Sequence, residues 1–245
     1  MDTTRAVYGL ESPGLDGQNQ IPETVEALAQ YHIDRIRIIQ PNGPYYLIGH
    51  SFGTAVALEI AWRLEQVDET LALLAVLDQP TPQYTPISDH EKQQTEFEWL
   101  WNIVLTFKLL ANIEPPFSLD GLKKTNSLNY ACRTVMNWLK QENAYNILFS
   151  SKGLPEELRA LVKVYRANAL AFAGYQPQDK RLRCTIDLFC TAESINRWGE
   201  EQPDGWGWRE HTLTGVRMHQ VTGSHFSMLN APQVQILADQ LTNIL

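Results

Sequence analysis

A serine between two glycines carries the clearest chemical signal in the sequence. Residues 46–53 read Tyr-Leu-Ile-Gly-His-Ser-Phe-Gly, and a helix-forming stretch follows at 54–64. A strand that enters G-x-S-x-G and continues as a helix is a nucleophile elbow, which lifts a serine hydroxyl above the end of a sheet. We expect a Cβ at Gly49 or at Gly53 to crowd the neighbouring strand and helix. The pattern predicts that Ser51 is a nucleophile.

A nucleophilic serine needs a base to take its proton and an acid to orient that base. Asp78 ends the apolar run 71–77, and His225 lies in the loop that follows the last predicted strand, 216–221. Groups at the carboxyl ends of parallel strands meet at one edge of a sheet, and Ser, acid, His is the chain order that accompanies an elbow. We therefore predict catalytic Ser51, Asp78 and His225. The backbone amide of Phe52 is the predicted oxyanion donor.

Each of these assignments has an ordinary alternative. An aspartate before Gln-Pro-Thr-Pro is often a turn or cap residue, as Asp78 is placed here. Two other acids compete for the same role: Asp187 lies within a predicted strand, and Glu193 follows the end of that strand. The sequence favours Asp78 and keeps Glu193 as the alternative partner of His225.

The other histidines and the aromatic residues indicate no second site. His50 occupies the variable position of the elbow, where it can pack beneath the serine. No metal-ligand spacing surrounds the remaining histidines, so we expect no metal. The aromatic stretch 97–107 and the tryptophans of 198–208 suit either an acyl channel or simple core packing, and packing is the commoner use.

The elements that position these residues alternate between strand and helix, with one interruption. Strands are expected at 7–10, 46–48, 71–77, 185–190 and 216–221, and helices follow Pro22, the elbow and Pro232. Between 85 and 173 only helical spacing occurs, at 88–112, 126–149 and 155–173. This order predicts an α/β fold with a mostly parallel sheet and an inserted helical lid. We expect one domain, with its core in 1–84 and 174–245.

Composition narrows the class of protein further. The 245 residues are 44% hydrophobic and 20% charged, as in a globular protein. A formal net charge of −8 argues against nucleic-acid binding, which needs clustered basic residues. No apolar stretch is long enough to span a membrane, and the first residues lack the apolar core of a signal peptide. Three cysteines without framework spacing suit buried thiols in the cytoplasm.

These motifs together resemble the thioesterase domains of nonribosomal peptide synthetases and polyketide synthases, which have the α/β-hydrolase fold. The resemblance implies that an acyl or peptidyl chain passes from the phosphopantetheine of a carrier protein to Ser51. Water or a nucleophile of the chain itself then releases it by hydrolysis or macrocyclisation. The implied partners are a carrier protein and an acyl or peptidyl substrate, with no cofactor of the domain's own. The matching segments are 7–10, 12–14, 49–53, Asp78, 165–168, 175–177 and 223–226.

The sequence departs from the family pattern before residue 7. Family members carry another strand there, with a glycine-containing loop that supplies the second oxyanion donor. We expect from this difference that the chain is a fragment, the product of a misplaced gene start, or one piece of a longer polypeptide. Two further hypotheses stay open: a discrete editing thioesterase, and a catalytically silent remnant that binds a carrier protein.

Overall fold

The computed structural model describes residues 6–84, 88–144, 155–198 and 205–244. Its chain divides into two compact units. The first, which we call the sheet unit, comprises Met1–Leu10, Glu23–Pro86 and Ala171–Leu245. The second, which we call the helical unit, comprises Glu11–Pro22 and Ile87–Leu170. The stretch 11–22 therefore groups with the helices, whereas the sequence placed it with the core.

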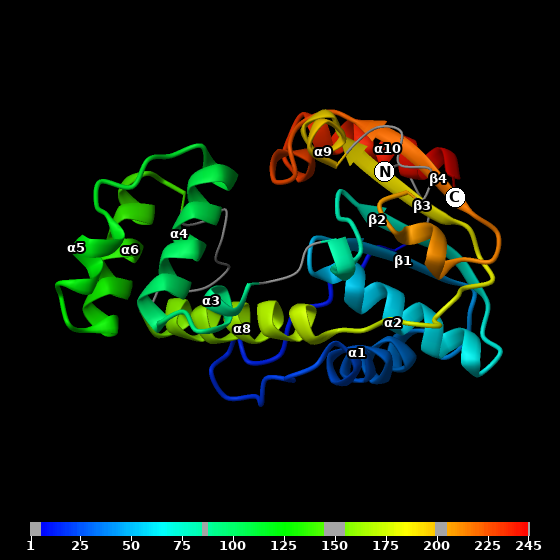
Figure 1. Cartoon of the computed structure of the whole chain (residues 1–245), viewed down its shortest axis with the longest axis horizontal. Helices are drawn as coiled ribbons and strands as arrows, with labels where there is room; N and C mark the ends of the chain where they lie inside the picture. The colour runs from blue at the N-terminus through cyan, green and yellow to red at the C-terminus, as the bar shows by residue number, and fades with distance from the viewer. Residues whose placement is uncertain (1–5, 85–87, 145–154, 199–204, 245) are drawn as a thin grey trace. The chain divides into compact units, whose positions relative to one another are not determined.

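A parallel four-stranded sheet forms the centre of the sheet unit (Figure 1). Its strands are β1 (Tyr45–His50), β2 (Leu71–Leu77), β3 (Ile186–Thr191) and β4 (Val216–Val221), in the order β1-β2-β3-β4. Every neighbouring pair is parallel, so all four carboxyl ends share one edge. The apolar runs of the sequence predicted these strands, and the mixed α/β fold with a parallel sheet is confirmed.

Helices cover both faces of the sheet. On one face, α1 (Val25–Ile39) and α2 (Gly53–Gln66) bury their apolar residues against the strands. On the other, α10 (Gln233–Ile244) packs Leu237 and Leu241 on side chains of β2 and β3. Because β2 is buried on both faces, its sequence is a continuous apolar run.

The segment 7–10 is not a strand, and that prediction was wrong. Val7 and Tyr8 are 72% and 62% exposed, and no ladder pairs them with another strand within the described parts of the chain. β-branched and aromatic residues such as Val7 and Tyr8 favour an extended backbone, but a strand exists only where a neighbour completes its hydrogen bonds. Among the described strands, β1 has β2 as its one neighbour.

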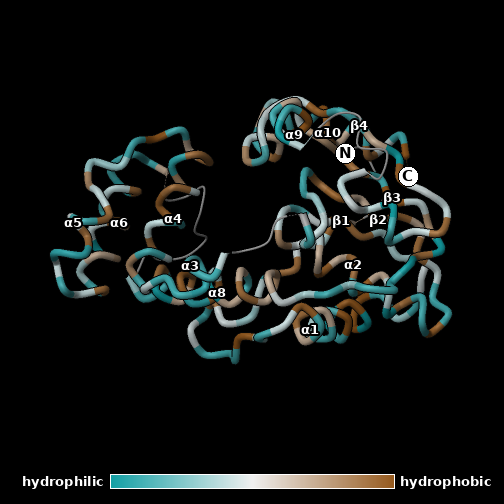
Figure 2. The backbone as a smooth tube through the Cα atoms, in the orientation of Figure 1, coloured by the Kyte–Doolittle hydropathy of each residue, from teal (hydrophilic) through white to brown (hydrophobic). Residues whose placement is uncertain are grey.

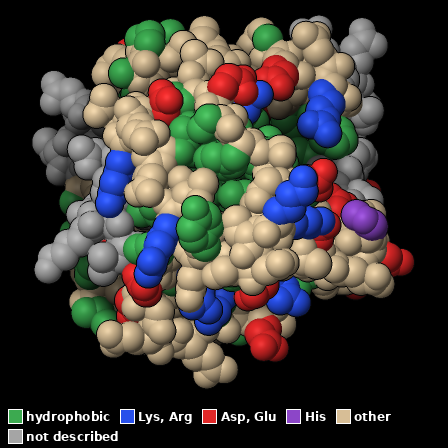
Figure 3. All heavy atoms as spheres, turned by 90° about the vertical axis from the view of Figure 1, so that its left-hand side faces the viewer, with side chains coloured by type: hydrophobic (Ala, Val, Ile, Leu, Met, Phe, Trp, Pro, Cys, Tyr) green, Lys and Arg blue, Asp and Glu red, His purple; other side chains and the backbone are tan. Residues whose placement is uncertain are grey.

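In the helical unit, side chains cap the starts of α3, α4, α5 and α6. Thr95 and Glu98 form a capping box that starts α4, since each side chain bonds the other residue's backbone N–H. Hydrophobic and hydrophilic residues alternate along the helices (Figure 2), and the apolar sides meet in a separate core. One face of the unit shows hydrophobic side chains among acidic and basic ones (Figure 3). The helices are α3 (Asp89–Lys92), α4 (Glu96–Ala111), α5 (Leu119–Lys123), α6 (Leu128–Gln141) and α8 (Pro155–Gly174), whose last residues belong to the sheet unit.

Several short elements were not predicted. They are α5, the helix α9 (Ala192–Trp198) directly after β3, and the 3₁₀ turns η1 (Pro82–Tyr84), η2 (Trp208–His211) and η3 (Ser227–Leu229). Part of the predicted helix 126–149, from residue 145 onward, lies outside the described residues. None of the described helices combines the length and the apolar character needed to cross a membrane.

Candidate active site

Ser51 lies at a sharp turn between β1 and α2. Its φ is 51°, in the left-handed region that non-glycine residues rarely adopt and that often marks functional sites. Thr54 holds the turn from the helix side, because its backbone N–H and its hydroxyl donate to the carbonyl of Ser51 at 3.0 and 2.7 Å. The strand, the strained serine and the helix have the form expected of a nucleophile elbow.

Only one of the two flanking glycines is required by close contact. A Cβ at Gly49 would lie 2.6 Å from the Cα of Thr54 and 2.7 Å from the carbonyl oxygen of Gly53. At Gly53 a Cβ would meet nothing within 4 Å. The expectation that both glycines prevent crowding is therefore corrected: α2 starts directly over Gly49, whereas Gly53 opens on free space.

Asp78 follows β2 and is buried, with 2% of its surface exposed. Its φ of 54° is also left-handed, a conformation that aspartate tolerates better than most residues. Thr191 donates its backbone N–H to Oδ1 at 2.7 Å and its hydroxyl to Oδ2 at 3.2 Å. The hydroxyl of Ser194 donates to Oδ2 at 2.7 Å. These donors satisfy a buried carboxylate and fix its direction.

His225 contacts Asp78 through one ring nitrogen. Its Nδ1 lies 3.2 Å from Oδ2 of Asp78 and 3.0 Å from the carbonyl oxygen of the same residue. Both neighbours are acceptors, so the geometry places the proton on Nδ1 and leaves the lone pair on Nε2. That tautomer is the one a general base needs to take a proton from an alcohol.

The loop that carries His225 is fixed by its own hydrogen bonds. Ser227 Oγ accepts from the backbone N–H of Ser224 at 2.8 Å, and Ser224 Oγ accepts from the N–H of Ser227 at 3.2 Å. Gly223 has a φ of 96°, and a Cβ there would lie 2.9 Å from Ser227 Oγ. The turn after β4 therefore requires glycine at this position.

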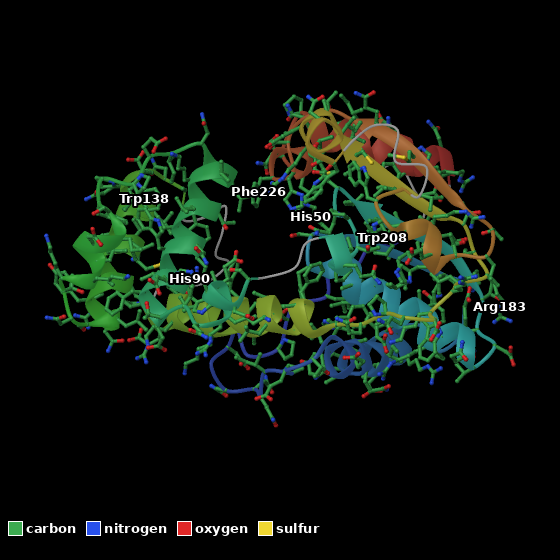
Figure 4. All side chains as sticks on the ribbon, in the orientation of Figure 1. His50, His90, Trp138, Arg183, Trp208 and Phe226 are labelled. Carbon is green, nitrogen blue, oxygen red and sulfur yellow. The ribbon has the colours of Figure 1, made fainter. Side chains whose placement is uncertain are left out.

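Two buried tryptophans hold the loop that follows Asp78. Trp208 donates its indole N–H to the carbonyl of Gln79 at 2.7 Å, and Thr81 donates its backbone N–H to the carbonyl of Trp206 at 3.1 Å. Both indoles are fully buried in the core beside α2. These two tryptophans therefore serve core packing and do not line an exposed acyl channel. Figure 4 shows Trp208 beside the sheet.

The competing acids lie elsewhere. Asp187 is buried on β3, where it accepts two hydrogen bonds from Arg217, at 2.9 and 2.8 Å, and lies 2.7 Å from His219 Nε2. Glu193 lies exposed in the first turn of α9. Among the described residues, the carboxylate in contact with the His225 ring belongs to Asp78.

The hydroxyl of Ser51 makes no hydrogen bond to the ring of His225 in the described part of the chain. Catalytic hydrogen bonds are often long without substrate and shorten in the productive complex. The side chain of His225 is 23% exposed, so it is not sealed inside the core. Phe52 caps α2, and no backbone acceptor for its N–H occurs among the described residues, so the amide is free to meet a developing oxyanion.

Thr191 and Ser194 were missed by sequence reasoning. Neither residue type carries a motif, and both matter because they bind Asp78. One signal was available for Thr191: it ends β3, at the same edge as Asp78 and Ser51. Ser194 lies close to Asp78 because α9 begins directly after β3, and no sequence pattern predicted that helix.

The chain is similar in sequence to parts of much longer proteins. The chain is 28% identical over 237 residues to the nonribosomal peptide synthetase ucdA of Aspergillus ustus. The aligned region covers 94% of this chain and 24% of the relative. It is 29% identical over 239 residues to the non-reducing polyketide synthase crz7 of Cladonia metacorallifera, covering 95% of this chain and 10% of the relative. The chain thus spans a quarter or less of the length of these relatives.

Solved structures share the fold. A crystal structure of a four-domain nonribosomal peptide synthetase bound to AMP and glycine matches with a TM-score of 0.78 at 22% identity, over 96% of this chain and 17% of that one. The NocB thioesterase domain, in covalent complex with a fluorophosphonate nocardicin G analogue, matches with a TM-score of 0.62 at 18% identity, over 96% and 81%. These likenesses show that the chain shares the fold of the NocB thioesterase domain and of part of the four-domain synthetase.

The family assignment rests on the whole sequence. The profile of the thioesterase domain family matches residues 1–245. The chain belongs to the thioesterase domain family.

Proposed function

We propose that this domain is a serine thioesterase that releases an acyl or peptidyl chain from a phosphopantetheinyl carrier protein. Family membership supports thioester chemistry, and the multidomain synthetases among its relatives support a carrier protein as partner. The observation that carries the proposal is the contact between His225 Nδ1 and the buried carboxylate of Asp78, at the same sheet edge as the strained Ser51.

The mechanism follows from these groups. His225 Nε2 takes the hydroxyl proton of Ser51 as Oγ bonds to the thioester carbonyl carbon. The oxyanion of the tetrahedral intermediate accepts from the Phe52 amide, and the imidazolium is stabilised by Asp78. The carbon–sulfur bond then breaks, and the proton on His225 passes to the leaving phosphopantetheine thiolate.

A second displacement frees the acyl group from Ser51. His225 removes a proton from water, which gives a free acid, or from a hydroxyl or amine of the chain itself, which gives a macrocycle. The proton returns to Ser51 Oγ as the ester bond breaks. The domain needs no cofactor for these steps, since the phosphopantetheine belongs to the carrier.

An acylated holo-carrier protein and the same acyl group on free pantetheine test the proposal. We expect this chain to release the acyl group from both, with a higher kcat/KM for the carrier. Ser51→Ala should lower kcat by about 10⁴-fold or more. Binding of the carrier without turnover by the folded wild-type protein would support the silent carrier-binding hypothesis and contradict the proposal.

A further inference from the structure

His50, the variable residue of the elbow, makes two contacts with His225. Its Nε2 lies 2.8 Å from the backbone carbonyl oxygen of His225. The two imidazole rings stack, with centroids 4.6 Å apart and planes inclined by 29°. Figure 4 shows His50 at the end of β1, with Phe226 at the same end of the sheet unit. One residue of the elbow therefore touches both the backbone and the ring of His225.

The hydrogen bond fixes the protonation of His50. A carbonyl oxygen only accepts, so Nε2 of His50 carries the proton and donates it. Burial, and next the proximity of His225, lower the pKa of His50, which outweighs the opposite effect of its bond to the His225 backbone. A neutral ring suits this place, because a cation stacked on His225 would oppose the imidazolium that forms during catalysis.

We propose that His50 is a positioning residue, which holds the backbone and the ring of His225 in the orientation that activates Ser51. The inference rests on the proposed function and adds a role to the elbow residue before the serine. The sequence suggested packing beneath Ser51, whereas the contacts of His50 lead across the sheet edge to the loop after β4.

The stack and the hydrogen bond act on different degrees of freedom. The bond from Nε2 restrains the main chain at 225, and the flat contact restrains rotation of the ring. Asp78 holds the same ring from its Nδ1 edge. With the edge and one face held, the direction of Nε2 is set before substrate arrives, which is the preorganisation that a general base needs.

Two variants separate the contacts. His50→Gln keeps an N–H donor and removes the ring, while His50→Phe keeps a flat ring and removes the donor; His50→Ala removes both. His32→Gln is the control, because His32 is a buried histidine on α1 of the same unit and contacts none of the proposed catalytic residues. Each protein is reacted with a small fluorophosphonate, and the rate constant and final extent of labelling at Ser51 are measured, together with kcat and KM.

We expect Gln and Phe each to lower the rate constant and kcat about threefold to tenfold, and Ala to lower them further, with KM unchanged. A residue that merely supported folding would lower the extent of labelling and leave the rate constant of the competent fraction intact. His32→Gln should label at the wild-type rate. Wild-type rate constants in all three His50 variants would overturn the inference.

A failure of the proposed function gives a different result, because the wild-type protein itself would then not label. In that case the ring nitrogens of His225 are observed by NMR in the wild type and in His50→Ala. The inference requires that the population of the Nδ1–H tautomer of His225 falls in the variant. An unchanged population overturns it.

Discussion

At the residue scale, the site depends on how Asp78 is held. The carboxylate is buried, yet three donors from Thr191 and Ser194 reach it, and His225 adds a fourth polar contact. A buried charge is tolerated only with such partners. The donors also leave Oδ2 directed at His225, so the acid orients the base without leaving the core.

Ser194 gives the sharpest test of this arrangement. Ser194→Ala removes the 2.7 Å hydrogen bond to Oδ2 and leaves part of a buried carboxylate unsatisfied. A hydrogen bond to a charged group contributes about 1.5–3 kcal/mol, so we expect kcat/KM for the thioester to fall by about tenfold to 150-fold. Glu193→Gln is the matched control at the adjacent exposed position and should keep wild-type kcat/KM. Equal losses in the two variants would contradict the role of Ser194 and revive Glu193 as the acid.

At the scale of elements, the close approach of α2 to β1 determines where Ser51 lies relative to the end of the sheet. Gly49 lets the first turn of α2 lie directly over the end of β1. The chain turns at Ser51, whose backbone is left-handed. A larger residue at 49 must push helix and strand apart, and Ser51 lies between them.

The two glycines of the elbow therefore differ in a measurable way. Gly49→Ala overpacks the turn, which typically destabilises a protein by about 1–3 kcal/mol, and it should slow labelling of Ser51. Gly53→Ala should change the free energy of unfolding by less than about 0.5 kcal/mol, because its Cβ meets open space. Urea unfolding and the labelling rate constant of both variants measure this. Equal destabilisation would show that the close approach at Gly49 is unimportant.

Some of these elements could be predicted from the sequence and others could not. β2 and β4 were predicted with their observed ends, because period and turn residues are local signals. The segment 7–10 has the same local character and forms no strand, because pairing depends on a distant neighbour that composition does not reveal. The positions of Asp78 and His225 could be predicted, because both residues follow the ends of predicted strands. The contacts of Thr191, Ser194 and His50 could not be predicted, because they depend on side-chain directions that only the folded structure fixes.

At the scale of the whole molecule, a buried ion cluster fixes where the chain returns to the sheet unit after the helical unit. Glu59 of α2 is 1% exposed and accepts from Tyr175 Oη at 2.9 Å, from Arg63 Nε at 2.7 Å and from Lys180 Nζ. Burial by itself raises the pKa of Glu59, but the hydrogen bonds from Lys180, Arg63 and Tyr175 outweigh it and the pKa is lowered. The return segment is thus anchored to the helix that begins at the elbow.

Lys180→Met tests the anchor. The substitution leaves the Glu59 carboxylate buried with one cation fewer. Losing one partner of a buried ion pair costs about 3–5 kcal/mol, and because Arg63 and Tyr175 remain, we expect the free energy of unfolding to fall by about 3 kcal/mol. Lys92→Met is the matched control, because the Lys92–Asp89 pair is exposed, and it should leave stability unchanged. Urea unfolding measures both, and similar losses would contradict the anchor.

The pH dependence has a definite sign. A carboxylate whose pKa is lower in the folded state stabilises the protein above its unfolded pKa, and this contribution is lost as the pH falls through the folded value. The wild type should therefore lose stability as the pH drops below about 4.5, the ordinary value for glutamate. Lys180→Met should show a shallower loss over the same range.

Covalent labelling of the folded protein with a small fluorophosphonate tests most directly whether His225 activates Ser51, with the modified residue located by peptide mass spectrometry. We predict one adduct, on Ser51, that is lost in Ser51→Ala and strongly slowed in His225→Ala. Ser88→Ala, which alters an exposed helix cap of the helical unit, should label like the wild type. Absence of an adduct on Ser51 in folded wild-type protein, or equal labelling of wild type and His225→Ala, would contradict the claim that His225 activates Ser51.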